Sequence, residues 1–569
     1  MATDSNIVVD DGRAKWSDLW LKEDYWAIWI GFFIIIVTGL IMMNGRADIE
    51  AKINKYNTII AAEKAKPIKT IELIDAQAAK KGVTGAKLPA AKTLISYLGK
   101  PGKWGSNPMD SFISHKNAAK EPAAKAAAEK AKAAKVAAKA AQDAAAAANF
   151  QNAELNKAAE KAISAWQKDV KAADKAKKAV GSDKNIIPGL VVLGLGLGVI
   201  TGLGMAVMGY NFVSYFIGFL AVFALSCLAN VLGGYKPTAA YGVNGEIMAI
   251  VTGMVIANTI GTPKWIMPAV QVEYYIKAGL VLLGAEVLFN KILAIGIPGI
   301  FVAWVVTPIV LCSTYIFGQK VLKMPSKTLN ITISADMSVC GTSAAIAVAA
   351  ACRAKKEELT LSVGLSMVFT AIMMIAMPAF IKMVGLPEIL GGAWIGGTVD
   401  STGSVAAAGA FLGPKALQVA ATIKMIQNVL IGVSAFCVAI YFATKVEQQE
   451  SGRTVGAMEI WNRFPKFVIG FLTASVVLSY ISGTIGADLG YALMDKGVLT
   501  VTKALRGHFF TLSFVAIGLA TNFRSLAHYF KGGKPLVLYV CGQTFNLSLT
   551  LFMAWIMFYK VFPEITASI

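Results

Sequence analysis

Long apolar runs dominate the chain after Asn185. The stretches Pro188–Met208, Val213–Leu232, Gly299–Phe317, Leu361–Phe380 and Phe467–Ile481 contain no charged residue. A helix of about 20 residues crosses the roughly 30 Å hydrocarbon layer of a membrane. The runs do not alternate polar and apolar positions, as the strands of a β-barrel do. The pattern therefore predicts an all-α, polytopic membrane protein.

The N-terminal stretch carries a different signal. Trp16, Trp20, Trp26 and Trp29 surround the start of an apolar run that continues to Met43. Tryptophan is enriched where a membrane meets water, because its ring has an apolar body and a polar N–H group. Residues 1–43 are predicted to form an interfacial helix that leads into a first span.

Residues 186–569 are predicted to form the main membrane domain. Two of its segments, Gly242–Thr259 and Ile389–Leu412, are short and rich in glycine, so they are candidates for broken or re-entrant helices. The predicted segments are Ile186–Gly209, Asn211–Leu232, Gly242–Thr259, Tyr274–Phe289, Ala294–Phe317, Asn330–Cys352, Leu359–Met383, Ile389–Leu412, Ala416–Ala443, Phe464–Ile485, Val498–Phe523 and Pro535–Phe558.

Residues 44–185 differ in composition and are predicted to be a soluble helical insertion. From about Asn117 to Lys178 the chain consists mostly of alanine and lysine. Both are strong helix formers, and "NFQN" at Asn149–Asn152 is the weak point of this tract. We predict two long helices that form a hairpin at this point, in the manner of a coiled coil. A low-complexity, partly disordered spacer is the alternative.

The charge of the chain is concentrated in this insertion. The net charge is +20, and 27 basic and 14 acidic residues fall between Asn44 and Asn185. No nucleic-acid-binding motif accompanies the lysines, so we expect no nucleic-acid partner. The six cysteines lie in apolar segments without metal-binding spacing, and the three histidines are scattered. We expect no metal and no cofactor apart from a coupling sodium ion or proton.

Basic loops indicate the orientation in the membrane. Loops rich in Lys and Arg at 320–327, 445–463 and 524–534 favour the cytoplasmic side. Counting alternate spans then places the N-terminus in the cytoplasm. The insertion is placed on the periplasmic or extracellular side of the inner membrane. The basic run Arg353–Glu358 conflicts with this count, because it falls on the outer side.

Two short segments resemble each other. Val281–Ala294 and Val515–Ala527 each carry a phenylalanine five residues after a glycine, and each precedes another apolar segment. They lie an odd number of segments apart, so they should run in opposite directions. Inverted repeats are a recurring plan of secondary transporters, with the substrate site where the repeats meet. A chance match is the alternative.

Small polar residues gather in two apolar segments. "SADMSVCGTSA" covers Ser334–Ala344, and "GGTVDSTGSVAAAG" covers Gly396–Gly409. Glycines loosen a helix, and hydroxyl groups can satisfy the freed backbone groups. Two unwound turns that face each other would expose N–H groups and helix N-termini, which favour an anion. Close helix packing through small residues is the alternative.

Charged residues within apolar segments are costly and usually functional. Asp336 and Asp400 lie in the two polar stretches, and Glu286 follows a glycine. Asp336, Glu286 and Asn428 are the candidates for ion coupling. Lys424 and Asn428 are four residues apart and share a helix face. Lys424 is expected to attract an anion or to pair with Asp400 or Asp336, unless it extends to the membrane surface.

Several motifs resemble a known family. "KAGLVLLGAEV", "MSVCGTSAAIAVAAACRAKKEE", "AWIGGTVDSTGSVAAAGA", "ATIKM" and "VAIGLATNFRSL" occur in this order. The order is similar to that in a bacterial family described as sulfate exporters, which is grouped with bile-acid/sodium-symporter-like transporters. The resemblance covers about Ile186–Phe558 and implies two crossed, broken helices in a mobile core that moves against a scaffold.

The resemblance also implies a set of site residues. Many members carry His-Glu in place of Asp400 and Ser401, and Arg in place of Gln427. The substrate site would be formed by Ser338, Cys340, Gly341, Thr342, Ser343, Thr398, Asp400, Ser401, Thr402, Ser404 and Lys424.

These observations lead us to expect a secondary transporter rather than an enzyme. The expected solute is a small anion (sulfate, sulfite or an organosulfonate) moved across the lipid bilayer by alternating access, with a homodimer as a compatible assembly. One alternative is a sodium or proton antiporter that uses Asp336 and Asp400 as carriers. The other is a non-transporting membrane scaffold or sensor whose working part is the Ala/Lys tract.

Overall fold

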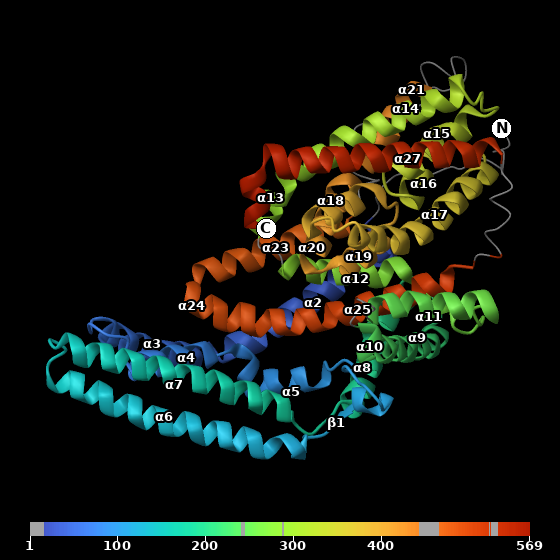
Figure 1. The fold of residues 1–569 in the computed structure, drawn as a ribbon. Coiled ribbons are helices and arrows are strands. Elements are labelled where there is room, and N and C mark those ends of the chain that lie inside the picture. The colour runs from blue at the N-terminus through green and yellow to red at the C-terminus, as the bar shows by residue number, and fades with distance from the viewer. Residues whose placement is uncertain (1–15, 240–244, 287–288, 443–465, 523, 525–532) are drawn as a thin grey trace.

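The computed structural model describes residues 16–239, 245–286, 289–442, 466–522, 524 and 533–569 (Figure 1). These residues are mostly helical and include the short antiparallel strands β1 (Ile113–Ser114) and β2 (Lys184–Asn185). The all-α, polytopic class is therefore confirmed. Eight helical stretches among these residues are long and apolar enough to span a membrane: Glu23–Asn44, Ile187–Val207, Phe212–Gly233, Ile295–Lys320, Glu357–Met383, Pro414–Tyr441, Phe467–Thr484 and Lys534–Val561.

One set of membrane helices, the scaffold group, is built around a central helix. That helix, α12, is buried along almost its whole length and packs against α2, α23 and α25. The group consists of α2 (Glu23–Asn44), α8 (Ile187–Val207), α9 (Phe212–Gly233), α11 (Gly245–Thr259), α12 (Val272–Glu286), α23 (Phe467–Thr484) and α25 (Leu499–Ala520).

Of the two segments that resemble each other, the first begins in α12 and continues into α13 (Phe289–Ile300), and the second begins in α25. Helices α12 and α25 run antiparallel. Ser513 Oγ donates to the carbonyl of Val272 at 3.0 Å, at the start of α12. Arg506, earlier on α25, donates to Glu286 at 2.7 Å, at the end of α12. Opposite directions are what an inverted repeat requires. Residues 287–288, 523 and 525–527 of these segments lie outside the described part of the chain.

The remaining membrane helices form the hairpin group. Two of its predicted segments are broken in the middle by a few non-helical residues. The group consists of α13 (Phe289–Ile300), α14 (Val306–Lys320), α15 (Lys327–Ser338), α16 (Thr342–Ala351), α17 (Lys356–Met383), α18 (Glu388–Thr398), α19 (Thr402–Leu412), α20 (Pro414–Asn428), α21 (Leu430–Tyr441), α27 (Lys534–Trp555) and α28 (Pro563–Ser568).

Each broken segment folds back on itself. Thr332 Oγ1 on α15 lies 4.0 Å from Cys352 Sγ at the end of α16. A Cβ added at Gly391 on α18 would lie 2.9 Å from Leu412 Cδ1 at the end of α19. The first and second hairpins (α15–α16 and α18–α19) are thus re-entrant. Because α17 connects their bases, they enter from opposite ends of that helix, and their tips meet.

The re-entrant first hairpin removes the conflict in the charge count. The chain enters and leaves this hairpin at one side, so Arg353 lies on the same side as the basic loop 320–327. The Lys534 amino group donates to the carbonyl of Lys323 in that loop at 3.0 Å, which places a second basic segment there. Lysines and arginines therefore gather at one end of the hairpin group, as the positive-inside rule expects of cytoplasmic loops.

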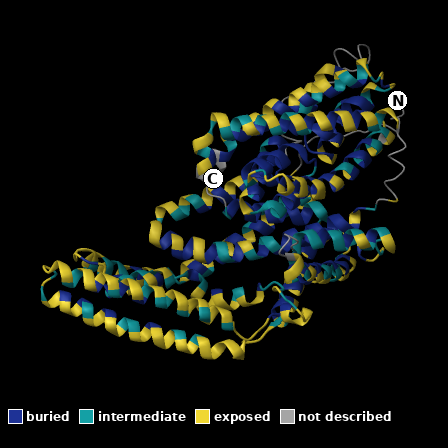
Figure 2. Cartoon of the chain, viewed as in Figure 1, coloured by how far each residue is buried: buried dark blue, intermediate teal, exposed yellow. Residues whose placement is uncertain are grey.

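The insertion contains the predicted helical hairpin. Helices α6 (Glu121–Ala147) and α7 (Ala153–Val180) meet at a break where Asn149 and Phe150 have positive φ, and Asn152 caps α7. Burial along the pair is modest (Figure 2), because alanine offers little apolar area. A third helix adds apolar contacts to the pair: Ile71 on α4 forms a buried cluster with Ala138, Ile163 and Trp166. The other helices here are α3 (Arg46–Lys64), α4 (Ile71–Gly82) and α5 (Pro89–Tyr97).

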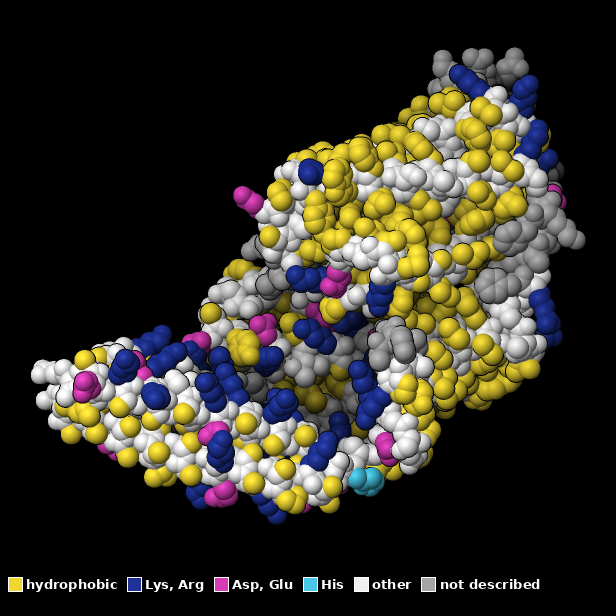
Figure 3. Space-filling view, in the orientation of Figure 1, with side chains coloured by type: hydrophobic (Ala, Val, Ile, Leu, Met, Phe, Trp, Pro, Cys, Tyr) yellow, Lys and Arg dark blue, Asp and Glu magenta, His cyan; other side chains and the backbone are white. Residues whose placement is uncertain are grey.

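The insertion is attached to the scaffold group. Trp104 Nε1 donates to the Val231 carbonyl at the end of α9 at 2.6 Å. Lys80 on α4 pairs with Asp488 at 2.6 Å, next to α23. Figure 3 shows apolar side chains over the membrane helices and Lys and Arg side chains over the insertion. The insertion therefore extends from the scaffold group, away from the hairpin tips.

The contact between α4 and α6 is expected to weaken in acid. Burial raises the pKa of Glu72, but hydrogen bonds from Lys139 and Gln142, each 2.6 Å, outweigh it and lower the pKa to about 2. A carboxyl with a depressed pKa stabilises the fold above its ordinary value of 4.5, and the contribution is lost as the pH falls toward 2. We expect hydrogen-exchange protection of α4 in the full chain to decrease across this window.

The matched variants are Glu72→Gln and Glu160→Gln, because Glu160 is exposed on α7. Glu72→Gln should lower the protection of α4 already at neutral pH, by less than about 1 kcal/mol, since the ion pair is partly exposed. Glu160→Gln should not change it. Equal protection in both variants would show that Glu72 does not hold α4 on α6.

Candidate functional site

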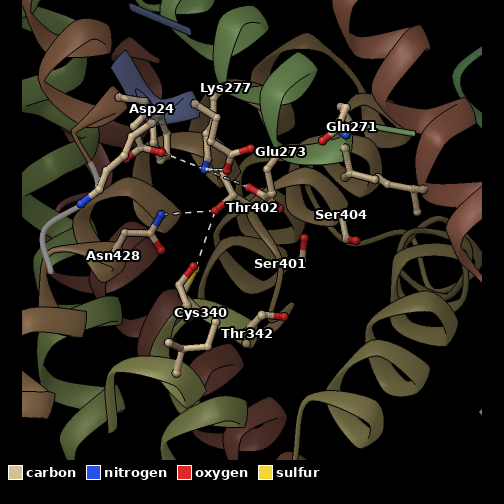
Figure 4. Close-up of a pocket in the computed structure, with 18 of the residues that line it drawn as sticks. Asp24, Gln271, Glu273, Lys277, Cys340, Thr342, Ser401, Thr402, Ser404 and Asn428 are labelled. Carbon is tan, nitrogen blue, oxygen red and sulfur yellow. Dashed lines mark hydrogen bonds and ion pairs between the residues drawn. The ribbon is translucent and has the colours of Figure 1, made fainter. Parts of the chain in front are cut away.

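A cavity of about 830 Å³ lies between the hairpin tips and the scaffold group (Figure 4). One wall carries the tips of both hairpins. The opposite wall is formed by the starts of α2, α12 and α23 and the end of α25. The cavity therefore lies between the two groups of membrane helices.

The tip of the first hairpin faces this cavity. Helix α15 ends at Ser338, and α16 begins at Thr342. Between them Gly341 has φ +51° and ψ −128°, a conformation that favours glycine. Four of the predicted residues line the cavity here: Cys340, Gly341, Thr342 and Ser343.

The second tip lies beside the first. Helix α18 ends at Thr398, and α19 begins at Thr402. Ser401, Thr402 and Ser404 line the cavity. Ser401 occupies the N-cap position of α19, yet neither α19 nor α16 has a side-chain cap. The first N–H groups of a helix need partners from outside the helix, so these two N-termini are available to water or a solute.

Side chains connect the two tips at the cavity wall. Cys340 Sγ lies 3.8 Å from Thr402 Oγ1, and Asn428 Nδ2 donates to the same oxygen at 3.2 Å. Asn428 also lines the cavity, and its Oδ1 is buried without a hydrogen-bond partner among the described residues. A buried polar atom without a partner is costly, and a bound molecule in the cavity could satisfy it.

Lys424 does not line the cavity, contrary to our expectation of a cation that faces the solute. Its amino group donates to the Val339 carbonyl at 2.6 Å and to Gln427 Oε1 at 2.8 Å. Gln427 Nε2 in turn donates to the carbonyls of Ser338 at 3.1 Å and Gly397 at 3.2 Å. These two side chains satisfy the carbonyl ends of α15 and α18, so Lys424 holds the tips from behind.

Four further predicted residues also lie behind the tips. Asp336 accepts a hydrogen bond from Ser362 at 2.6 Å, and Asp400 accepts one from Ser366 at 3.2 Å and another from Tyr539. Ser338 and Thr398 donate to carbonyls within their own helices. None of Asp336, Ser338, Thr398 and Asp400 lines the cavity.

Glu286 lies away from the tips. It is buried against Arg506, with 2.7 Å between Arg506 Nε and its Oε1, and the pair joins α12 to α25. Neither residue lines the cavity. The structure therefore places Glu286 in a contact within the scaffold group, and not with the other candidates for ion coupling.

The scaffold wall carries charged residues that the sequence did not single out. Lys277 on α12 lies 2.5 Å from Glu23, 2.8 Å from Asp24 and 3.9 Å from Glu273. The backbone N–H of Lys466, at the start of α23, donates to Asp24 at 2.8 Å. A lysine inside the apolar run "YYIKAGLVLL" was the signal that could have found this cluster. It places fixed charges opposite the hairpin tips (Figure 4).

Fold and site together define a polytopic α-helical membrane protein with two re-entrant hairpins beside an internal cavity. The family model of conserved hypothetical protein 698 matches residues 217–539. A UPF0324 membrane protein of Nitratidesulfovibrio vulgaris is 59% identical over 576 residues, covering 100% of this chain and 99% of the relative. The chain therefore belongs to this family of membrane proteins.

Other relatives match a smaller part of the chain. UPF0324 membrane protein RB9488 of Rhodopirellula baltica is 58% identical over 356 residues, 62% of this chain and 65% of the relative. UPF0324 inner membrane protein YeiH of Escherichia coli is 27% identical over 338 residues, 57% of this chain and 89% of the relative. The matched family region lies wholly beyond the insertion. No solved structure matches the chain.

Proposed function

We propose that the protein is a secondary transporter that moves a small anion across the membrane by alternating access. Sulfate, sulfite and organosulfonates are the anions that the family resemblance indicates. One observation carries the proposal: the uncapped N-termini of α16 and α19 open onto the same cavity. Helix N-termini bind anions through free N–H groups and the helix dipole.

The arrangement of the two helix groups supports alternating access. The cavity lies between them, and most contacts of the hairpin tips are made within the hairpin group. The hairpin group can therefore move against the scaffold group without losing the contacts that shape its tips. The basic loops at one end of the hairpin group favour the cytoplasmic side there, with the insertion on the outer side.

The charge of the cavity favours one competitor, a cation antiporter. The lining includes four acidic residues (Asp18, Glu23, Asp24 and Glu273) and three basic residues (Lys22, Lys277 and Lys466).

Flux measurements in proteoliposomes distinguish an anion transporter from a cation antiporter. An anion transporter should accumulate labelled sulfate, sulfite or ethanesulfonate. Sodium or proton exchange without any effect of these anions would instead support an antiporter, and no flux at all would favour a scaffold or sensor.

We also expect the anion to protect Cys340 from alkylation. Cys340 lines the cavity, so a small maleimide should reach it in a variant whose other five cysteines are alanine. Sulfate bound at the tips would slow labelling, whereas an equal ionic strength of chloride would not. The matched control is Ala128→Cys in a chain without the native cysteines, because Ala128 is exposed on α6 in the insertion. Equal slowing at both cysteines, or at neither, would contradict anion binding at the tips.

A further inference from the structure

A second polar cluster lies behind the hairpin tips, outside the cavity. Asp336 on α15 is fully buried and Asp400 in the second tip is 2% exposed. Hydroxyl groups of α17 contact both, since Ser362 donates to Asp336 and Ser366 to Asp400. Tyr539 on α27 also donates to Asp400. The two carboxyl groups belong to different hairpins, so this cluster joins the hairpins to each other.

One oxygen of this cluster has no partner. Asp336 Oδ1 is buried and forms no hydrogen bond with any described residue. Leaving a carboxylate oxygen desolvated and unpaired costs several kcal/mol by order of magnitude. A carboxylate oxygen is an acceptor, so it can be satisfied by a cation or by a proton that neutralises it. A water molecule or another hydrogen-bond donor would also satisfy this oxygen, so the charges around it decide which ligand fits.

The charges around the cluster indicate a ligand that carries positive charge. The elements packed against the two aspartates contribute hydroxyl groups from α17 (Ser362, Ser366 and Thr370) and α27 (Tyr539). Among the described residues, the ammonium group that acts on Asp400 is that of Lys424 on α20. Two carboxylates and one ammonium group leave one negative charge buried, and burying an unbalanced charge is expensive. One monovalent cation balances the cluster.

We propose that Asp336 and Asp400 together bind one proton, and that this proton is the coupling ion of transport. The proposal rests on the proposed transport function. The proton comes from water and forms an O–H bond at one carboxyl group of the pair. A proton needs only one oxygen, whereas a dehydrated sodium ion needs several, and Asp336 Oδ1 has no hydrogen-bond partner among the described residues.

The position of the pair explains how the proton would act on the solute site. Gly341 at the first tip directly contacts the Asp400 segment, since a Cβ added there would lie 3.3 Å from Asp400 Cβ. When the pair is protonated, the hairpins approach without repulsion between two carboxylates. When the proton leaves, two like charges face each other across the hairpin junction. Proton release therefore loosens the tips that hold the anion.

Infrared difference spectroscopy on the purified full chain tests the proton site without any solute. At neutral pH we expect a carbonyl stretching band of a protonated, buried carboxyl group, and it should disappear in both Asp336→Asn and Asp400→Asn. Asp24→Asn is the matched control, because Lys277 at 2.8 Å keeps Asp24 ionised and the band should remain. Ser362→Ala serves as a second variant if Asp336→Asn does not fold, and it should shift the band.

The outcomes separate this inference from the proposed function. A band that persists in both aspartate variants would overturn the proton site. The wild-type band is also measured in potassium buffer and in sodium buffer. If the band is lost when sodium replaces potassium, the proton site is overturned, because sodium would then occupy the pair. Anion flux without the band would contradict the proton site alone, whereas the band without any flux would contradict only the transport function.

Discussion

Replacing Gly341 by alanine is expected to weaken anion binding strongly and to slow transport while the scaffold group remains folded. Gly341 has φ +51° and ψ −128°, and a side chain in such a conformation costs about 1–3 kcal/mol. A Cβ would also lie 3.1 Å from Ser366 Oγ and 3.3 Å from Asp400 Cβ. The tip must shift to relieve this contact, and the N–H groups of α16 shift with it. A cost of this size corresponds to roughly a 5- to 150-fold loss of affinity.

Gly196→Ala is the control for this prediction. Gly196 lies on α8, where an added Cβ meets nothing within 4 Å, and alanine is the better helix former. Anion flux and the thermal unfolding midpoint in detergent should be measured for both variants. Gly196→Ala should transport normally. Normal affinity in Gly341→Ala would show that the first tip does not hold the anion.

The sequence predicted the tips well because their composition is unusual for a membrane segment. Both breaks are marked by glycine and hydroxyl residues, at positions where leucine would suit a membrane helix better. Seven of the eleven predicted substrate-site residues line the cavity. The fold-back of Asn330–Cys352 was not predictable, because this segment has the length of a full span. Contacts such as that between Thr332 and Cys352 show that the segment folds back, and these contacts form only in the tertiary structure.

The sequence also could not predict which neighbours the individual charged side chains contact. A helical wheel places Lys424 and Asn428 on one face of α20, but it does not say which neighbour that face meets. In the structure Asn428 reaches the cavity, whereas Lys424 extends behind the tips to Val339. Glu286 likewise had a partner, Arg506, that lies 220 residues further along the chain. Pairing at such separation leaves no local signal.

Lys424→Met is therefore expected to destabilise the hairpin group rather than merely to weaken anion binding. Lys424 is 1% exposed, and its amino group donates to Val339 and Gln427. Methionine has a similar length but no donor, so the Val339 carbonyl loses its partner and the negative charge of Asp400 loses its nearby cation. Breaking a buried charged contact costs about 3–5 kcal/mol. The thermal unfolding midpoint should fall markedly, and protection of α15 and α18 from hydrogen exchange should fall with it.

Lys415→Met distinguishes this role from a general effect of losing a lysine in α20, because Lys415 is exposed on the same helix. That variant should keep both its stability and its anion affinity. In Lys424→Met, protection of α12 and α25 should remain, since these helices belong to the scaffold group. If Lys424→Met instead kept its stability and lost only sulfate binding, Lys424 would have to face the solute. The hairpin tips would then need to rearrange during transport so that its amino group leaves Val339 and enters the cavity.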